Sequence, residues 1–497
     1  MIESLIQFKV LVPWLLGMVF GVFVGATPGL TATMAVALIV PLSFHMEPTA
    51  GLAMIIGVSF TAIFAGDIPA TYLRIPGTPA SAAATLDGHE LAKKGRGHFA
   101  LMLDLFCSCI GGLVGVGLLI LIAPLLAKFA LNFTHFEYFW LGVLGLSISA
   151  VVCGGDTFKA LMSAALGLLI ATAGRDIIAN VPRYTFGSIH AEAGLSFIPA
   201  MIGLFGVSEV LRNVLRKESL SAPTANETER TTPFDTLIEI WKHKWTVLKS
   251  SIVGTTIGAL PGAGADIAAW GAYGLAKKTS RNTNEFGSGE TEGVIAPTSA
   301  NNAAVAGAWI PALVFGVPGD AVTAIVLGAF VMYNIKPGPQ LFQSSGDQVN
   351  QIFAIALITQ FLLLACGFLG IKTFGWILKL PRSVVMVAVL VFSVVGAYAL
   401  NNSFFDVYVM IAFGVVGFFM ESQRVPLAPM ILGMILGPMV EEKLRTGLIA
   451  TSGDITPFFT RPISAVLVGL LVIAFVLPAI VKVKRLLTPS ASGRGSG

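Results

Sequence analysis

The stretch GATPGL, residues 25–30, interrupts an apolar segment that runs from Val10 to Phe44. Proline lacks a backbone N–H and breaks the helical ladder, while glycine allows unusual backbone angles and close approach. Broken backbone at membrane depth is tolerated only where protein buries it or where it lines a watery cavity. The same interruption recurs as GALPGA, residues 258–263. Each break therefore indicates either a packing kink or a site.

The composition places these breaks in a membrane protein. Of 497 residues, 55% are hydrophobic and only 12% are charged, with a mean hydropathy of +0.82. Soluble domains carry about 25% charged residues. Apolar runs such as 110–127, 352–370 and 463–481 approach the length of about 20 residues that a span requires. We therefore predict an all-α polytopic membrane protein. The net charge of +4 is spread over loops, which indicates membrane topology rather than nucleic-acid binding.

Cysteine and histidine usage gives no sign of a metal or redox site. The four cysteines all lie in apolar runs without a CxxC pair, so we expect buried small side chains. The six histidines lack metal-ligand spacing, and we expect no metal and no cofactor. Pro13 and Trp14 interrupt the first apolar run, which argues against a cleavable signal peptide.

The breaks form an internal repeat. GATPGLTA (25–32) matches GALPGAGA (258–265), and RIPGTPASA (74–82) corresponds to GVPGDAVTA (316–324) in the same order. One isolated Pro-Gly would favour a packing kink, but four in repeat register favour a site. Internal duplication of broken helices is typical of secondary transporters.

The Lys/Arg bias of the loops is swapped between the two copies. In the first copy the loop at 93–96 contains Lys and Arg residues, and the loop at 43–48 contains none. In the second copy the basic residues are in the loop at 277–281, and the loop at 336–340 has only Lys336. Because Lys and Arg favour the cytoplasmic side, equivalent loops are predicted on opposite sides, which makes the repeats inverted.

The runs that flank the first break are short. Residues 10–24 and 30–44 each make roughly 22 Å of helix, too little to span comfortably. A re-entrant hairpin of two half-helices is predicted there.

The sequence predicts a division of the chain into six blocks. They are a first repeat core (1–99), scaffold-type spans (100–211, with two short helices in 138–173 joined near Gly154 and Gly155), a polar loop with an interfacial amphipathic arm (212–245), a second repeat core (246–345), further scaffold-type spans (346–485) and a disordered tail (486–497).

Two groups of residues near the breaks are candidates for function. Half-helix N-termini with neighbouring hydroxyls suit an anion, and freed carbonyls, carboxylates and amides suit a cation such as Na⁺. The expected substrate-binding residues are Thr27, Pro28, Gly29, Pro76, Gly77, Thr78, Pro79, Ser81, Pro261, Gly262, Ala263, Gly264, Pro318 and Gly319. The expected cation-coupling residues are Gly25, Asp67, Gly258, Asp266, Asn301, Asn302, Asp320 and Thr323.

Some of these polar residues allow another interpretation. Asn301 and Asn302 could equally cap a helix. Asp87, in LDGHELAKKG, is expected in a surface turn because glycine and a basic cluster follow it.

The long motifs resemble a known family. GATPGLTATMAVALIVPLSF, IPGTPASAAATLDGHELAKKG, GALPGAGADIAAWGAYGLAKK and EGVIAPTSANNAAVAGAWIPALVFGVPGDAVTAIVLGA are similar to the large membrane subunit of the tripartite tricarboxylate transporter family, from about residue 8 to 485. The resemblance implies a bacterial inner-membrane symporter driven by a cation gradient, with Na⁺ as the expected coupling ion.

The same resemblance implies partners and site positions. The partners are a small integral membrane subunit and a periplasmic binding protein that delivers an organic carboxylate. The family motif positions are Pro28, Gly29, Pro76 to Pro79, Pro261, Gly262, Asn301, Asn302, Pro318 and Gly319. Asp320 departs from the small residue expected there, which bears on cation or substrate preference.

Two rival functions stay open at this point. A passive anion channel also accommodates duplicated broken helices. An intramembrane enzyme is less well supported, because no HExxH motif is present and CGGD (153–156) and VPGD (317–320) only partly match GxGD. For a transporter, the four breaks are expected to converge on one site, with the repeat cores moving against the scaffold spans as an elevator or by rocking.

Overall fold

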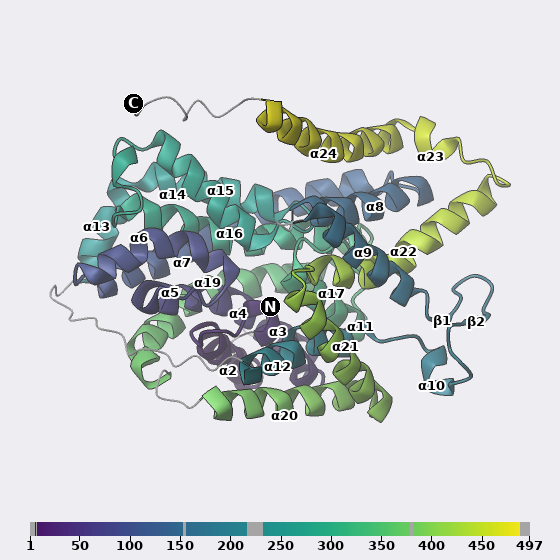
Figure 1. Ribbon diagram of the computed structural model, residues 1–497, viewed down its shortest axis with the longest axis horizontal. Coiled ribbons are helices and arrows are strands. Elements are labelled where there is room, and N and C mark those ends of the chain that lie inside the picture. Colours follow the sequence, from purple (N-terminus) through teal and green to yellow (C-terminus); the bar gives the residue numbers. More distant parts are fainter. Residues whose placement is uncertain (1–4, 6, 153–155, 216–231, 378–381, 488–497) are drawn as a thin grey trace, which may run out of the picture.

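The protein is almost entirely helical in the computed structural model, which describes residues 5, 7–152, 156–215, 232–377 and 382–487 (Figure 1). Within this part of the chain, seven helices are long and apolar enough to cross a membrane. They are Phe8–Gly25, Pro48–Leu73, Gly97–Ala130, Phe197–Val214, Gly346–Ile377, Ser383–Asn401 and Phe404–Ser422. The architecture is that of an all-α polytopic membrane protein, as the composition predicted.

The first repeat core begins with helices that end at its Pro-Gly breaks. Its elements are α2 (Phe8–Gly25), α3 (Ala32–Ser43), α4 (Pro48–Ala65), α5 (Asp67–Leu73), the 3₁₀ turn η1 (Pro79–Ser81) and α6 (Ala82–Lys93), and α7 (Gly97–Ala130) runs from its end into the block predicted as scaffold. Thr31 caps α3, because its hydroxyl accepts a hydrogen bond from the Met34 N–H at 3.2 Å. Gly17, Gly21 and Gly25 of α2 face the backbone of α4, so these two helices approach closely.

The second repeat core also begins with a helix that ends at a Pro-Gly break. Its elements are α14 (Lys244–Gly258), α15 (Gly264–Thr279), η3 (Thr283–Glu285), α16 (Thr291–Phe315), α17 (Ala321–Met332) and α18 (Leu341–Ser344), and α19 (Gly346–Ile377) begins the block predicted as scaffold. Gly254 and Gly258 of α14 face the backbone of Ala300 and Ala304 in α16, in the manner of α2 on α4.

The remaining elements lie around these two cores. They are α8 (His135–Val152), α9 (Thr157–Ala171), β1 (Gly174–Arg175), β2 (Pro182–Arg183), α10 (Ile189–Glu192), α11 (Phe197–Met201), the π-helical turn η2 (Ile202–Val207), α12 (Ser208–Leu215), α13 (Pro233–Lys242), α20 (Arg382–Asn401), α21 (Phe404–Ser422), α22 (Ala428–Ala450), α23 (Pro457–Thr460) and α24 (Pro462–Leu487). Strands β1 and β2 pair antiparallel, with Gly174 opposite Arg183.

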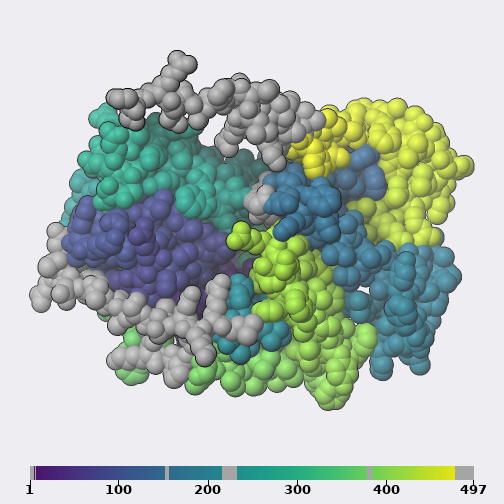
Figure 2. Space-filling model, in the orientation of Figure 1, coloured from purple at the N-terminus to yellow at the C-terminus, as the bar shows by residue number. Residues whose placement is uncertain are grey.

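Helix α16 forms the centre of the molecule. Every residue from Glu292 to Val314 is buried, and the helix packs on α7, α14 and α15. Gly111 of α7 leaves no room for a side chain against the backbone of Ser299. The violet surface of α6 and α7 accordingly lies beside the teal surface of α14 and α15 in Figure 2.

The lengths of the half-helices differ from expectation. Helix α3 has 12 residues and is short, but α2 has 18 and meets the length and hydropathy of a span. The prediction of two equally short runs is therefore wrong for the first of them, because α2 begins at Phe8 and includes Gly25, which adds three residues to the run 10–24.

The cysteines in the described part of the chain are buried, as the sequence predicted. Cys107, Cys109 and Cys366 are buried and free. Cys153, together with Gly154 and Gly155, lies outside the described residues, and so does most of the polar stretch before α13. The two short helices expected in 138–173 are α8 and α9.

The prediction for Asp87 is wrong. It lies within α6 and its side chain is 0% exposed. Its Oδ1 accepts hydrogen bonds from three backbone N–H groups, those of Gly287 (2.8 Å), Gly289 (2.8 Å) and Glu290 (2.9 Å), and Oδ2 accepts one from the Tyr273 hydroxyl at 2.9 Å. Asp87 therefore fastens the first copy to the loop that precedes α16.

Candidate functional site: the Pro-Gly breaks

The first break of each copy has the same backbone geometry. Helices α2 and α14 end at Gly25 and Gly258, and the glycine after proline is left-handed in both, with φ of 94° at Gly29 and 81° at Gly262. Only glycine adopts this conformation without strain. The repeat read from the sequence is therefore matched by local structure.

The second breaks also correspond. The residue two positions before proline is left-handed in both copies, with φ of 58° at Arg74 and 69° at Gly316. After the glycine, a polar pair spans three residues in each copy: the hydroxyls of Thr78 and Ser81 are 2.8 Å apart. In the second copy Asp320 Oδ1 accepts from the Thr323 N–H at 2.7 Å.

Asp320 and Thr323 form a capping box at the start of α17. Asp320, where a small residue was expected, thus stabilises a helix N-terminus.

The two breaks within a copy touch each other. A side chain on Gly77 would collide with the Gly25 carbonyl, and one on Gly319 would come within 2.6 Å of the Gly258 carbonyl. The Gly262 N–H donates to the Gly319 carbonyl at 2.7 Å. Each copy therefore brings its two tips together through glycine contacts.

The two copies meet along their second helices. Turn η1 of the first copy lies against α15, and α17 of the second copy lies against α3. At one end of the molecule Lys94 Nζ donates to the Ser288 carbonyl at 2.6 Å. At another place the Tyr333 hydroxyl donates to the Ser43 carbonyl at 2.6 Å.

A sealed polar cluster links the copies in the interior. Asp67, at the start of α5, is 1% exposed, and Asn301 Nδ2 donates to its Oδ2 at 3.2 Å. The Ser81 hydroxyl and the carboxyl group of Asp104 lie next to Asp67. Asp104, on α7, is also 1% exposed and accepts from the Ser108 hydroxyl at 3.1 Å.

Asn301 and Asn302 lie in the middle of α16, so the alternative that they cap a helix is wrong. Neither atom of the Asn302 amide has a hydrogen-bond partner within the described chain. A pair of buried amides in a helix interior is costly without a ligand or a partner.

The tips themselves are partly open. Gly29, Pro76, Pro79 and Asp266 are exposed, whereas Thr78 and Ser81 are 2% and 0% exposed. Asp266 on α15 lies near Asp320 of the same copy. The structure thus sorts the predicted acidic residues into two groups, one beside each pair of tips.

Other predicted residues take structural contacts. The Thr27 hydroxyl donates to the Phe23 carbonyl at 2.7 Å. Pro28 is buried, Pro261 is half-buried and Pro318 is buried, while Ala263 and Gly264 lie at the start of α15.

Asp104 was missed by the sequence analysis. The signal was available, because a carboxylate within the apolar run of α7 is expensive at membrane depth and indicates function. What the sequence lacked was the partner, since α5 and α7 meet only in the folded chain.

Two cavities in the structure are lined by residues other than the predicted substrate-binding and cation-coupling residues. One of about 770 Å³ lies between the β1–β2 hairpin, α10, α21 and α22, and is lined by residues that include Arg175, Arg183, His190 and Glu441. Another of about 520 Å³ lies near Phe315, Lys336 and Lys443.

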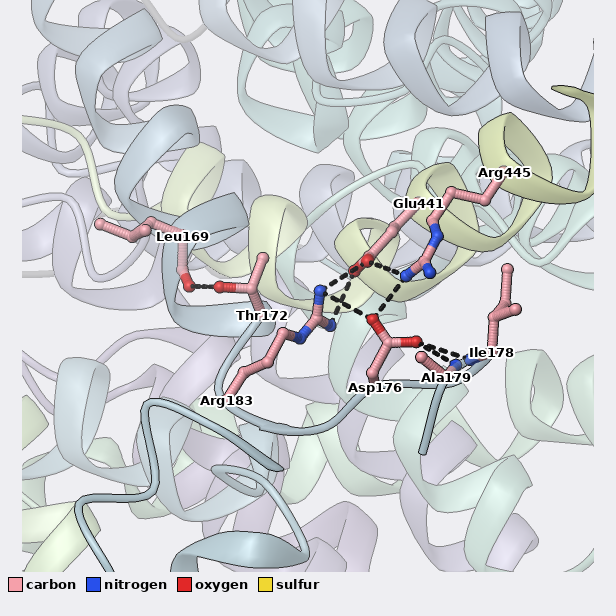
Figure 3. Close-up of polar contacts among 8 residues, drawn as sticks. All are labelled: Leu169, Thr172, Asp176, Ile178, Ala179, Arg183, Glu441 and Arg445. Carbon is pink, nitrogen blue, oxygen red and sulfur yellow. Dashed lines mark hydrogen bonds and ion pairs between the residues drawn. The ribbon is translucent and has the colours of Figure 1, made fainter. Parts of the chain in front are cut away.

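Two residues that line the larger cavity, Arg183 and Glu441, belong to an ion-pair network, which Figure 3 shows. Arg183 reaches Glu441 at 2.7 Å and Asp176 at 3.3 Å, and Arg445 bridges the same two carboxylates. The hydrogen bond from Arg183 holds the pKa of Glu441 below its ordinary value. The backbone N–H of Ala179 and the Arg445 side chain lower the pKa of Asp176. The hairpin is thereby fastened to α22.

Comparison with known proteins now gives the chain a family context. The model of the tripartite tricarboxylate transporter TctA family matches residues 11–432. An uncharacterized 52.8 kDa protein in the TAR-I ttuC' 3' region of Agrobacterium vitis is 35% identical over 478 residues, 94% of this chain and 93% of that protein. An uncharacterized protein in the TAR-II ttuC' 3' region of the same organism is 38% identical over 224 residues, 45% of this chain and 93% of its own length. No solved structure matches the chain.

Proposed function

Since this chain belongs to the tripartite tricarboxylate transporter TctA family, we propose that it is the large membrane subunit that takes up an organic carboxylate by coupling to a cation gradient, with Na⁺ as the ion. The observation that carries this proposal is the pairing of four Pro-Gly breaks with matching backbone geometry in two copies. Broken helices in paired repeats provide the anion and cation sites of secondary transporters.

The partners follow from family membership. A small integral membrane subunit completes the membrane part, and a periplasmic binding protein delivers the carboxylate, which is a tricarboxylate, a dicarboxylate or an aromatic acid. The location is the bacterial inner membrane. In this proposal the binding protein selects which carboxylate reaches the membrane subunit.

The inverted relation of the repeats is part of the proposal, and two contacts support it. Lys94 of the first copy meets the loop at Ser288, just after the basic cluster of the second. Tyr333 of the second copy meets Ser43, in the loop that lacks Lys and Arg. Each contact lies next to a pair of loops that the swapped charge bias assigns to the same side of the membrane.

The substrate is held by the N-termini of the helices that begin at the breaks. Helices α3, α6, α15 and α17 have 12, 12, 16 and 12 residues, and each starts within or directly after a tip. Helix N-termini offer free N–H groups and roughly half a positive charge each, so they can bind a carboxylate without a lysine or arginine. The exposed sides of Gly29, Pro76 and Pro79 allow access in the first copy.

The transport step moves the tip-bearing cores against the scaffold-type spans of 100–211 and 346–485, as an elevator or by rocking. The cation-coupling residues Asp67, Asn301 and Asp320 belong to the two cores and therefore move with the cores.

The test is uptake in proteoliposomes that contain this subunit, the small subunit and the cognate binding protein. A panel of carboxylates is offered with and without a Na⁺ gradient. Accumulation above equilibrium that requires both the gradient and the binding protein is expected. Uptake that only equilibrates, with no dependence on either, would identify a passive channel instead.

A further inference from the structure

Two carboxylates share the sealed cluster without a basic partner. Asp67 and Asp104 lie side by side, each 1% exposed. Their described neighbours are Ser81, Ser108 and Asn301, and no Lys, Arg or His side chain is among them. Two adjacent buried carboxylates cannot both be ionised unless a cation compensates them.

Several oxygens in the cluster lack a donor. Asp67 Oδ1, Asp104 Oδ2 and Asn301 Oδ1 have no hydrogen-bond partner in the described chain. Asn301 is 0% exposed, and its other amide atom already donates to Asp67, so the free oxygen lies beside the pair. Each buried unsatisfied group costs about 1–3 kcal/mol.

The number of free oxygens distinguishes a metal cation from a proton. A proton shared by the two carboxyls satisfies one oxygen–oxygen contact and leaves the remaining acceptors unpaired. A hard cation coordinates several oxygens at once and prefers carboxylate and carbonyl ligands. The cluster of free oxygens therefore favours a metal cation.

We propose that Asp67, Asp104 and Asn301 form the Na⁺ site, with Asp104 as the second carboxylate ligand. This assignment rests on the proposed cation-coupled function and names the residues that perform the coupling. The ligands come from α5, α7 and α16, so the ion holds the first repeat core against the central helix of the second.

The same contacts connect the ion to the substrate tip. Ser81 lies next to Asp67 and is hydrogen-bonded to Thr78 at 2.8 Å. A side chain at Gly66 would lie 2.7 Å from both hydroxyl oxygens, which shows how closely this tip packs on the α4–α5 junction. Loading of Na⁺ therefore fixes residues 76–81, where the substrate carboxylate is expected to bind.

The experiment measures ion binding without transport. The full chain in detergent is heated in a NaCl series, with choline chloride keeping the ionic strength constant. A ligand that binds only the folded state raises the Tm with its concentration. Wild type is expected to show a Na⁺-specific rise, and Asp104→Asn is expected to raise the apparent dissociation constant at least about tenfold, as for a loss of about 1.4 kcal/mol.

Two further variants serve as a control and as a substitute for Asp104→Asn. Asp406→Asn is the matched control, because Asp406 is 4% exposed, bonds to Asn401 at 2.8 Å and lies in α21 away from the cluster. It should keep the full Na⁺ response. If Asp104→Asn does not fold, Ser81→Ala is measured instead, and it should weaken the response while leaving the Tm in choline close to wild type.

The results separate this assignment from the proposed function. A full Na⁺ response in Asp104→Asn, or an equal Tm of wild type in Na⁺ and choline, overturns the site. A Tm that responds to pH but not to Na⁺ also overturns it, in favour of a shared proton. If Na⁺ binds at Asp104 but uptake needs no Na⁺ gradient, the site stands and the coupled function fails.

Discussion

Single residues explain why the breaks contain glycine, and the two left-handed glycines differ in their surroundings. At Gly29 an added Cβ would meet nothing closer than 3.5 Å, at Asn213. At Gly262 it would collide with the backbone of Ser149 in α8. Backbone strain is therefore common to both positions, but only the second also lacks space.

Replacement of these glycines should separate transport from stability. Gly29→Ala costs about 1–2 kcal/mol of backbone strain and should abolish most uptake while the protein still inserts and folds. Gly262→Ala should lose uptake and also lower the Tm further. Gly274→Ala is the control, because nothing lies within 4 Å of its added Cβ, and it should behave as wild type. Near wild-type uptake in both tip variants would make these glycines packing residues only.

Asp87 provides a second test on a single side chain. Asp87→Ala removes four hydrogen bonds and leaves the N–H groups of the half-buried Gly289 and the buried Glu290 without an acceptor, so a loss of about 3 kcal/mol or more in unfolding free energy is expected. Tyr273→Phe removes one of these bonds and should cost about 1 kcal/mol. Thermal unfolding in detergent measures both. Equal, small losses would mean that the loop at 287–290 is held by other contacts.

At the level of helices, the corner between α13 and α14 depends on a histidine. His243 Nδ1 lies 3.1 Å from Glu292 Oε1, in the first turn of α16, and Nε2 lies 3.5 Å from Glu239 Oε1. The hydrogen bond to Glu292 raises the pKa of His243 above 6.5, and the same bond lowers the pKa of Glu292 from 4.5 to about 2. Both groups are thus stabilised in their charged forms.

The sign of these shifts predicts a pH window. The pair contributes fully between the ordinary pKa values of 4.5 for Glu and 6.5 for His. Its contribution is lost as pH rises through the raised pKa of His243, and also as pH falls toward the lowered pKa of Glu292. The difference in unfolding free energy between wild type and His243→Gln, read from thermal unfolding, should therefore be largest near pH 6, at about 1 kcal/mol, and small near pH 9. A difference that grows with alkaline pH would contradict this account.

For the whole molecule, the arrangement of the two repeats decides which loops share a side of the membrane. The contacts of Lys94 with Ser288 and of Tyr333 with Ser43 bring together loops that the charge bias assigned to common sides. Figure 1 shows α6 of the first copy near α14 and α15 of the second copy at one end of the molecule.

Labelling of single cysteines in a cysteine-free background tests this arrangement. Glu47, Lys94, Lys278 and Gln340 are all exposed and suitable for substitution. Cysteines at 94 and 278 should react only from the cytoplasmic side, and those at 47 and 340 only from the periplasmic side. Residues 94 and 278 reacting from opposite sides would exclude inverted repeats.

The sequence by itself determined the membrane class, the helical breaks and the glycines at their tips. These features are local: apolar length is counted along the chain, proline removes its own N–H, and glycine is required wherever φ is positive. Only the tertiary structure decided which polar residues are buried together. The Gly and Lys residues near Asp87 in the sequence predict a surface turn, yet in the structure a loop distant in sequence encloses its side chain. Asp104 joins Asp67 and Asn301 because α5, α7 and α16 pack side by side, and burial of a charge depends on that packing, which no local pattern records.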